Sequence, residues 1–330
     1  KRALSVVILD ENERLGNKIY ASGNGRCNLA NTMIDDSSFR GDNPDFYHQV
    51  ISCFDDKNTL KYFKELGLYT TMMNKTCVYP ASKQAASVVH VLSDKLDALR
   101  VKVILNAKVE SINKDKEGGF LVKYNQTKIN CKNVIIACGG KSGIKKPDIM
   151  NGYQLASKLG HKIIKPLPAL VPLVASTKIN FNKLAGVRAV SIGSLYIEDK
   201  FITKSHGELQ FTNYGVSGIM IFELSRYAVQ GINQHKKVSI TFDFSHEDLT
   251  VANIREVLTK CPYKSIIQVY EGFLDYKLAY EIIKQAGFVP ESKASRLREA
   301  DLVTIDTYIR QFVVPITDFK SFDKAQVTMG

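Results

Sequence analysis

Two stretches decide the fold of this chain: Val6-Val7-Ile8-Leu9-Asp10 and Ala21-Ser22-Gly23-Asn24-Gly25-Arg26-Cys27-Asn28. The first is an apolar run that ends on a carboxylate, a pattern typical of a buried strand in a parallel sheet. A carboxylate at the carboxyl end of such a strand accepts hydrogen bonds from the ribose hydroxyls of a dinucleotide. We therefore expect residues 5–10 to form a buried strand whose Asp10 binds an adenosine ribose.

The second stretch predicts a loop beside a flat or phosphorylated ligand. Gly23 and Gly25 carry no Cβ, so their backbone can come close to such a ligand. Arg26 supplies positive charge for a phosphate group. Together with Asp10, this loop indicates FAD.

The same segments resemble a known family. Residues 8–18 and 22–31 are similar to the aminoacetone-oxidase and BaiN-type FAD-dependent oxidoreductases of bacteria. Further similar segments follow in order: Val78-Tyr79-Pro80-Ala81-Ser82, Val134-Ile135-Ile136-Ala137-Cys138-Gly139-Gly140-Lys141-Ser142, Gly207-Glu208-Leu209-Gln210-Phe211-Thr212-Asn213-Tyr214-Gly215-Val216-Ser217-Gly218 and Ala325-Gln326-Val327-Thr328. Each match alone is weak, but ordered matches across most of the chain are specific to this family.

The chain departs from the family pattern at both ends. A GxGxxG turn is expected roughly 20 residues before the ribose carboxylate, and Asp10 leaves no room for it. The family also continues past the Gln-Val-Thr segment into a glycine-rich stretch, whereas this chain stops at Gly330. The sequence is therefore expected to be an internal piece of a longer protein.

The resemblance implies an α/β fold: a Rossmann-like FAD-binding domain of the two-dinucleotide-binding-domain type, with an inserted β-rich and helical domain. We expect residues 1–170 to form the first part of the FAD-binding domain, 171–312 the inserted domain, and 313–330 the return. Three prolines between Pro166 and Pro172 are typical of a fixed extended crossing between domains. Beyond them, alternating stretches predict an antiparallel sheet or small barrel, and residues 247–310 a helical region.

Local patterns predict further elements. We expect helices to start at Asn43-Pro44, at Asp56, which caps a helix ending at Gly67, and at Ser82, whose helix runs to Arg100. We also expect helices over 152–160 and 219–230, strands over 101–106, 108–113, 120–124, 134–138, 187–197 and 238–244, and a hairpin turn over 116–119.

The resemblance also assigns candidate site residues. Asp10, with Glu11 and Asn12 beside it, is expected at the ribose, and Lys18 and Arg26 at the pyrophosphate. The backbone of Val109 is expected at the adenine. The loop along the flavin comprises Ser22, Gly23, Asn24, Gly25, Arg26, Cys27 and Asn28, and the glycine pair after the 134–138 strand adds Ala137, Gly139 and Gly140. For Cys27, a small side chain that fills a tight turn is the alternative.

Tyr79, Phe211 and Tyr214 are candidates for the substrate side, because a tyrosine offers an apolar ring with a polar tip. Packing in a core or interface is the alternative for these side chains. No catalytic residue is predicted, since the flavin itself carries the redox chemistry. The six histidines show no metal-ligand spacing, and no metal site is predicted.

Composition limits the remaining possibilities. The chain has 330 residues, of which 45% are hydrophobic and 24% charged, as expected of a globular protein large enough for two domains. No apolar run has the roughly 18–20 residues needed to span a membrane. The six scattered cysteines favour a reducing cytoplasm over a disulfide framework.

We therefore predict an FAD-dependent oxidoreductase that transfers a hydride between flavin and a small amine or carbonyl-type substrate. NAD(P)H or oxygen would be the second partner. The formal charge of +12 leaves two alternatives open: a flavoprotein that acts on RNA, and a non-catalytic nucleic-acid-binding protein on a decayed flavin fold. Because the lysines are spread along the chain, nucleic acid is the less favoured partner.

Overall fold

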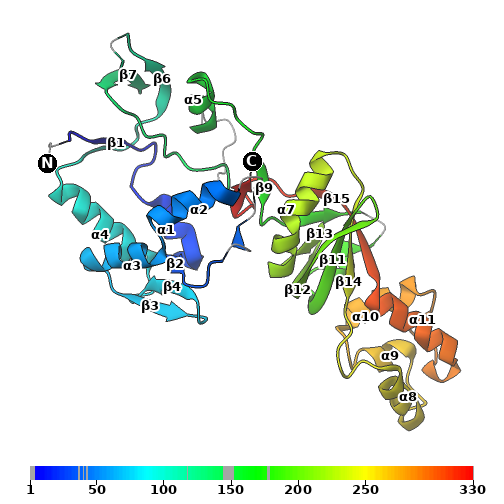
Figure 1. The fold of residues 1–330 in the computed structure, drawn as a ribbon. Coiled ribbons are helices and arrows are strands. Elements are labelled where there is room, and N and C mark those ends of the chain that lie inside the picture. The colour runs from blue at the N-terminus through cyan, green and yellow to red at the C-terminus, as the bar shows by residue number, and fades with distance from the viewer. Residues whose placement is uncertain are drawn as a thin grey trace. The chain divides into compact units, whose positions relative to one another are not determined.

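The structure, a computed structural model, describes residues 4–35, 38–39, 41, 44–116, 118–143, 152–176 and 179–329. The chain divides into two compact units, residues 1–135 and 136–330 (Figure 1). Small sheets and helices form the first unit, whereas a closed barrel and a group of helices dominate the second.

The first unit carries most of the predicted cofactor-binding residues. Its elements are β1 (Val7–Leu9), α1 (Asn17–Ala21), the 3₁₀ turn η1 (Ser22–Gly25), β2 (Ala30–Asn31), α2 (Pro44–Cys53), α3 (Asp56–Glu65), β3 (Thr70–Met73), β4 (Cys77–Pro80), α4 (Ala85–Ala98), β5 (Lys102–Ile104), β6 (Val109–Lys114), β7 (Phe120–Tyr124) and β8 (Thr127–Cys131). They form a parallel β1–β5 pair and two antiparallel sheets, β2–β4–β3 and β6–β7–β8.

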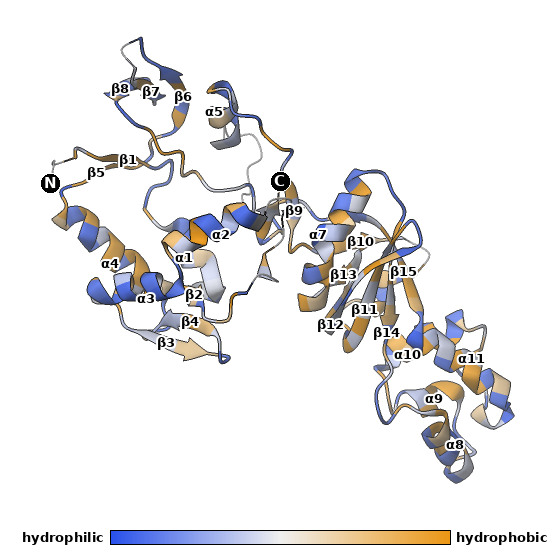
Figure 2. Ribbon diagram, in the orientation of Figure 1, coloured by the Kyte–Doolittle hydropathy of each residue, from blue (hydrophilic) through white to orange (hydrophobic). Residues whose placement is uncertain are grey.

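The parallel pair carries the predicted ribose carboxylate. Val7, Ile8 and Leu9 of β1 lie opposite residues 102–104 of β5, and both strands are largely apolar in Figure 2. The strand is shorter than the expected 5–10 and is not fully buried, since Val7 is 38% exposed. In the described part of the chain β5 is its one partner, so much of the apolar strand surface stays uncovered.

The expectation of a strand over residues 134–138 is wrong. The structure assigns no strand there, and Ile135 is 90% exposed. A strand needs a neighbour that pairs with its N–H and C=O groups. No described strand pairs with this segment, so apolar composition alone does not make it one.

The helices of the first unit follow the predicted patterns, with shifted starts. Asp55 and not Asp56 caps α3, because its side chain accepts a hydrogen bond from the Asn58 amide at 2.7 Å. Helix α4 begins at Ala85 and not at Ser82, and it buries the predicted apolar face. Asn43 and Glu117, expected at a helix start and a turn, lie outside the described residues.

The second unit contains α5 (Gly152–Lys158), β9 (Leu167–Ala169), β10 (Leu173–Ala175), α6 (Phe181–Leu184), β11 (Arg188–Ile197), β12 (Lys200–Thr212), β13 (Gly215–Ser217), α7 (Ile219–Asn233), β14 (Val238–Asp243), α8 (Val251–Lys260), α9 (Ile266–Tyr270), α10 (Tyr276–Gln285), the 3₁₀ turn η3 (Ala294–Arg296), α11 (Glu299–Arg310), β15 (Phe312–Phe319) and β16 (Val327–Met329). Six of its strands close a barrel in the order β10–β13–β12–β11–β14–β15.

Alternating side chains build the barrel core, as the pattern predicted. Leu195, Leu209, Ile240, Phe242 and Val314 are fully buried, while the residues between them along each strand are more exposed. Strand β15 belongs to this barrel, since Phe312–Ile316 pair with β14, and Ile316, Asp318 and Phe319 pair with β10. The barrel strands therefore continue to Phe319, and the expected domain limits stay predictions.

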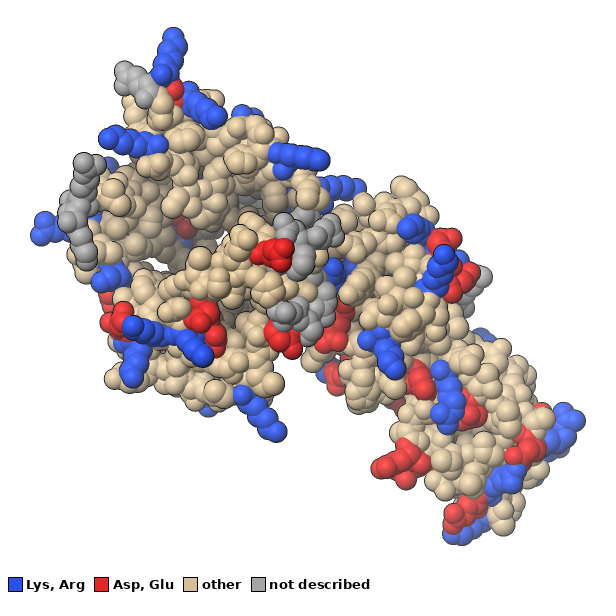
Figure 3. Space-filling view, viewed as in Figure 1, with Lys and Arg blue, Asp and Glu red and all other residues tan. Residues whose placement is uncertain are grey.

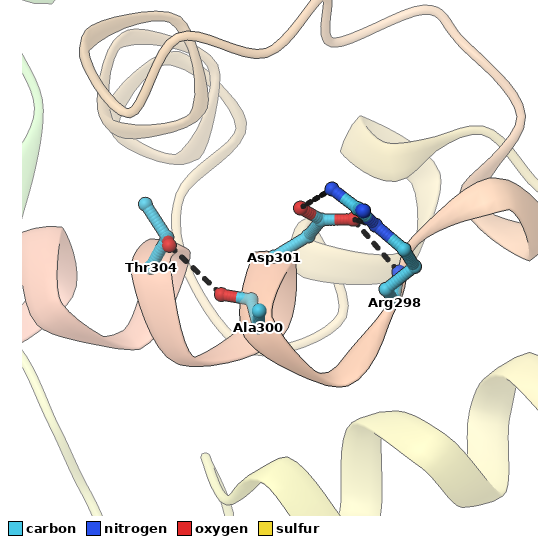
Figure 4. Close-up of polar contacts among 4 residues, drawn as sticks. All are labelled: Arg298, Ala300, Asp301 and Thr304. Atoms are coloured by element: carbon cyan, nitrogen blue, oxygen red, sulfur yellow. Dashed lines mark hydrogen bonds and ion pairs between the residues drawn. The ribbon is translucent and has the colours of Figure 1, made fainter.

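The predicted helical region contains α8 to α11. Helix α11 begins with a cap in which Asp301 accepts hydrogen bonds from the backbone N–H of Arg298 at 2.8 Å and from its guanidinium (Figure 4). One turn on, the Thr304 hydroxyl donates to the Ala300 carbonyl at 2.8 Å. This cap fixes the start of the helix that leads into β15.

The end of the chain leaves the barrel and pairs elsewhere in the second unit. Strand β16 runs antiparallel to β9, with Thr328 opposite Pro168 and Val327 opposite Ala169. The Gln326 amide donates to the Leu170 carbonyl at 3.2 Å. The proline-rich crossing and the Gln-Val-Thr segment therefore lie side by side.

Candidate functional site

The carboxyl end of β1 holds Asp10 in a defined position. Its backbone N–H donates to the Ile104 carbonyl at 3.0 Å, which continues the pairing with β5. Its Oδ1 accepts from the amide of Asn12 at 2.9 Å and from the Asn12 side chain at 2.8 Å. Both bonds use one carboxylate oxygen, so the turn orients the second oxygen, Oδ2, of a partly exposed side chain for a ligand.

Val109 begins β6 shortly after a backbone contact with Asp10. The Ala107 amide donates to the Asp10 carbonyl at 2.8 Å, and β6 starts two residues later. Val109 pairs with Tyr124, and the register shifts immediately after it. The structure thus brings the two residues predicted at the adenosine to one edge of the first unit; the binding role of each stays a prediction.

The motif loop is a tight turn held by its own backbone. Gly23 and Asn24 have left-handed dihedrals, with φ of 55° at each. The amides of Arg26 and Cys27 donate to the carbonyls of Gly23 at 3.2 Å and Ser22 at 3.1 Å. These bonds fold the loop back on itself and present its middle residues to solvent.

The two loop glycines differ in what a side chain would meet. A Cβ on Gly23 would lie 2.7 Å from the Asn28 amide nitrogen and 3.3 Å from Cε1 of Tyr79. A Cβ on Gly25 would meet nothing within 4 Å. Gly23 therefore permits the turn itself, while Gly25 leaves an open approach to backbone that a flat cofactor can use. This open cradle fits a flavin-type ligand.

Cys27 supports the packing alternative. Its side chain is 7% exposed and lies in a small core with Leu68, Ala85 and Val88. Only its backbone can therefore face a ligand on the loop surface. Tyr79 is partly buried against Gly23, so the structure brings one substrate-side candidate to the motif loop.

The remaining predicted polar residues of the first unit are exposed: Glu11, Asn12, Lys18, Arg26 and Asn28. Arg26 follows the turn directly, and Lys18 lies on α1 one turn before it. Cations at these places can approach a phosphate without disturbing a core. The structure leaves their pyrophosphate role as a prediction.

The predicted glycine pair of the second unit also divides into two roles. A Cβ on Gly139 would meet nothing within 4 Å, whereas one on Gly140 would lie 2.9 Å from Oγ1 of Thr328. Ala137 is exposed in the segment before them. Only Gly139 therefore offers an open approach, and Gly140 makes room for Thr328. Thr328 belongs to the Ala325-Gln326-Val327-Thr328 segment, but composition and spacing predict no role for it.

Phe211 supports the alternative of packing in the core. Its side chain is 0% exposed, and its ring packs 6.3–6.4 Å from the rings of Phe181, Phe244 and Phe312. The alternating pattern of β12 turns it into the barrel core, where no substrate reaches it. Tyr214 instead lies in the turn after β12, partly exposed, with Nζ of Lys320 3.8 Å from its ring centroid. No sequence pattern predicts that Lys320 lies beside the Tyr214 ring.

Metal sites and membrane-spanning helices are two further features that the described residues can be examined for. Over the described ranges, His, Cys, Asp and Glu side chains form no group of three that could hold a metal ion. Among the helices described, none has the length and apolarity required to cross a membrane.

Comparison with known proteins gives the family. Residues 1–294 match the model described as the HI0933-like protein Rossmann domain. The chain is 34% identical to the 3-dehydro-bile acid delta(4,6)-reductase of Clostridium scindens, over 98% of this chain and 80% of that protein. It is 24% identical to the ribosomal RNA dihydrouridine synthases of Haemophilus influenzae and Escherichia coli, covering 80% and 78% of those proteins.

These matches confirm the predicted family, the Rossmann-like fold with its inserted barrel, and an oxidoreductase activity. They also support a flavin-type dinucleotide cofactor. The chain belongs to the HI0933-like family of Rossmann-fold oxidoreductases.

Proposed function

We propose that the protein is an FAD-dependent oxidoreductase that moves a hydride between flavin and a small carbonyl-conjugated or amine substrate, with NAD(P)H or oxygen as second partner. When bound, FAD supplies the ring that accepts or donates the hydride. One observation carries the proposal: the Asp10 carboxylate stands at the carboxyl end of a parallel strand pair, oriented through Oδ1 by Asn12. Ligands of doubly wound sheets bind at this end.

The residues around Asp10 suit the parts of the cofactor. Its Oδ2 would accept a bond from a ribose hydroxyl, and the backbone of Val109 would lie at the adenine. Lys18 and Arg26 would neutralise the pyrophosphate charge. In the first unit, Gly25 is open and has positive φ, so it would let backbone approach the flat ring, while Gly139 of the second unit keeps its separately predicted role at the flavin.

Two tyrosines, one in each unit, stay separate candidates for contact with the substrate. Tyr79 packs on the motif loop, and Tyr214 presents a ring beneath the Lys320 ammonium. An aromatic face suits an apolar ring system, while a nearby cation or hydroxyl can bind a carbonyl oxygen. The relative named as a reductase of a 3-dehydro bile acid favours the carbonyl-conjugated class over the amine class.

The test starts from the protein expressed from its complete coding sequence. We expect a flavin absorption spectrum, and mass analysis of the released ligand should identify FAD. Anaerobic mixing with NADH and with NADPH then shows which nucleotide bleaches the flavin, and cyclic enones and small amines follow as separate substrates. A purified, folded protein that takes up no flavin from added FAD would refute the proposal.

RNA is the second candidate substrate, because lysines gather on the β6–β8 sheet. Lys114, Lys128 and Lys132 are exposed there, and basic side chains predominate around these strands in Figure 3. The two relatives named as ribosomal RNA dihydrouridine synthases point the same way. Two results would favour this candidate. The logarithm of the RNA-binding constant should fall linearly with the logarithm of the salt concentration. The double variant Lys128→Gln/Lys132→Gln should bind RNA more weakly than the wild type, whereas Lys237→Gln should not.

A cytoplasmic location is part of the proposal. The six cysteines, all among the described residues, form no disulfide, although Cys53 and Cys138 are exposed to solvent. Exposed thiols persist in a reducing compartment.

A further inference from the structure

We infer that Thr328 is a positioning residue that holds the loop 139–143 in the conformation that binds the cofactor. This inference rests on the proposed function, because the open side of that loop is one of the surfaces assigned to the flavin. It adds a residue for which composition and spacing gave no role. The contacts made by the Thr328 hydroxyl group support it.

The Thr328 hydroxyl joins two groups of the same loop residue. The Ser142 amide donates to Oγ1 of Thr328 at 3.1 Å, and the two side-chain hydroxyls lie 2.7 Å apart. Ser142 is only 7% exposed. A hydroxyl from the far end of the chain therefore binds both the backbone and the side chain of one buried residue.

Gly140 provides the space into which Thr328 fits. A Cβ at Gly140 would lie 2.9 Å from Oγ1 and 3.2 Å from Cβ of Thr328. Its neighbour Gly139 has a φ of +74° and faces open space. One side of the glycine pair is thus anchored and the other side is free to meet a ligand.

Thr328 itself is held firmly. It lies in β16, opposite Pro168 of β9. Six residues before it, the Phe322 carbonyl accepts from the Gly143 amide at 2.8 Å, and Nζ of Lys141 lies 5.6 Å from the Phe322 ring centroid. The segment 322–328 therefore contacts the loop at two separate places.

The loop depends on these anchors because residues 133–140 have no helix or strand. Backbone without regular pairing keeps one conformation only where side chains or other segments bind it. If the Thr328 hydroxyl is removed, the Ser142 amide loses this acceptor. The open face at Gly139 is then no longer held ready for the cofactor.

The experiment compares Thr328→Val, which keeps the shape and loses the hydroxyl, with Thr328→Ser, which keeps the hydroxyl. Thr241→Val is the matched control, since Thr241 lies in the barrel strand β14, away from the loop. Hydrogen exchange at the Ser142 amide of the apoprotein measures the anchor, and FAD titration with the visible flavin spectrum measures the cofactor site.

We expect Thr328→Val to speed exchange at Ser142 and to weaken FAD binding about tenfold, the equivalent of one to two hydrogen bonds. Thr328→Ser should restore both, and Thr241→Val should change neither. Ser142→Ala, which keeps the amide bond, should give a smaller loss and serves if Thr328→Val fails to fold.

Three results would overturn the inference. Unchanged exchange at Ser142 in Thr328→Val would show that the hydroxyl does not anchor the loop. Faster exchange with unchanged FAD affinity and spectrum would show an anchor that does not position the cofactor site. A wild-type protein that binds no flavin would refute the proposed function and the positioning role with it, while the exchange data would still decide whether the anchor exists.

Discussion

Alanine substitutions at Gly23 and Gly25 separate a glycine needed for the turn from one needed for the ligand. Both have positive φ, +55° and +79°, so a Cβ at either costs about 1–2 kcal/mol of backbone strain. At Gly23 the Cβ also lies 2.7 Å from the Asn28 backbone nitrogen, which cannot move without shifting the loop. Overpacking of this kind adds about 1–3 kcal/mol.

These magnitudes predict different melting temperatures for the apoproteins. At about 2–4 °C per kcal/mol, Gly25→Ala should melt about 4 °C below the wild type and Gly23→Ala about 10 °C below it. Gly67→Ala is the control for strain alone, because Gly67 has a φ of +85°, meets nothing within 4 Å and lies outside the loop.

FAD titration of the same variants tests the ligand role. Gly25→Ala should weaken FAD binding about tenfold or more, since its Cβ fills the space through which the cofactor approaches. Gly67→Ala should melt like Gly25→Ala and bind FAD like the wild type. Equal melting of the Gly23 and Gly25 variants, or normal FAD affinity in Gly25→Ala, would refute this division of roles.

Three further predictions test separate parts of the molecule. Asp10→Ala should lower FAD affinity by roughly ten- to a hundredfold in a titration of the apoprotein, because a charge-assisted bond to the ribose contributes about 1.5–3 kcal/mol; unchanged affinity would leave Asp10 as a strand end only. Phe211→Ala should lower the free energy of unfolding, measured by urea titration, by about 3–5 kcal/mol, as truncation of a side chain in a packed core does. A much smaller decrease would contradict the core position of Phe211 and favour its role as a substrate-side residue. Asp301→Asn should melt below the wild type at pH 6. The Arg298 backbone N–H and then its guanidinium lower the pKa of Asp301, so this difference should vanish as the pH falls through that lowered pKa, and a difference that stays constant as the pH is lowered would contradict the charge-based cap.

The barrel was predictable because its pattern is local. In β11 and β14, inward and outward residues alternate, and β11 also pairs antiparallel with β12, the next strand along the chain. The amphipathic helix α4 was predictable for the same reason, since its buried Ala85, Val88 and Val89 lie at helical spacing. Patterns of this kind need no information from distant parts of the chain.

The apolar runs around residues 5–10 and 134–138 show the limit of that reasoning. A uniformly apolar run predicts a strand buried between neighbours, but it does not say which neighbours. Val7–Leu9 finds β5 and forms a strand, whereas 134–138 has no partner among the described strands and forms none. Periodicity identifies the apolar segment, and pairing with distant residues decides its structure.

The two glycine pairs of the candidate site show the same limit of sequence patterns. In sequence, Gly23 and Gly25 are equivalent, as are Gly139 and Gly140, because residue identity does not reveal which atoms lie next to the position that a Cβ would take. In the structure, Gly23 faces the Asn28 backbone and Gly140 faces Thr328, while the other glycine of each pair faces open space. A loop that must stay still beside a ligand needs both kinds of glycine, since close packing on one side supplies the rigidity that an open side requires. The anchored glycine should therefore affect stability and cofactor affinity together, and the open glycine mainly affinity.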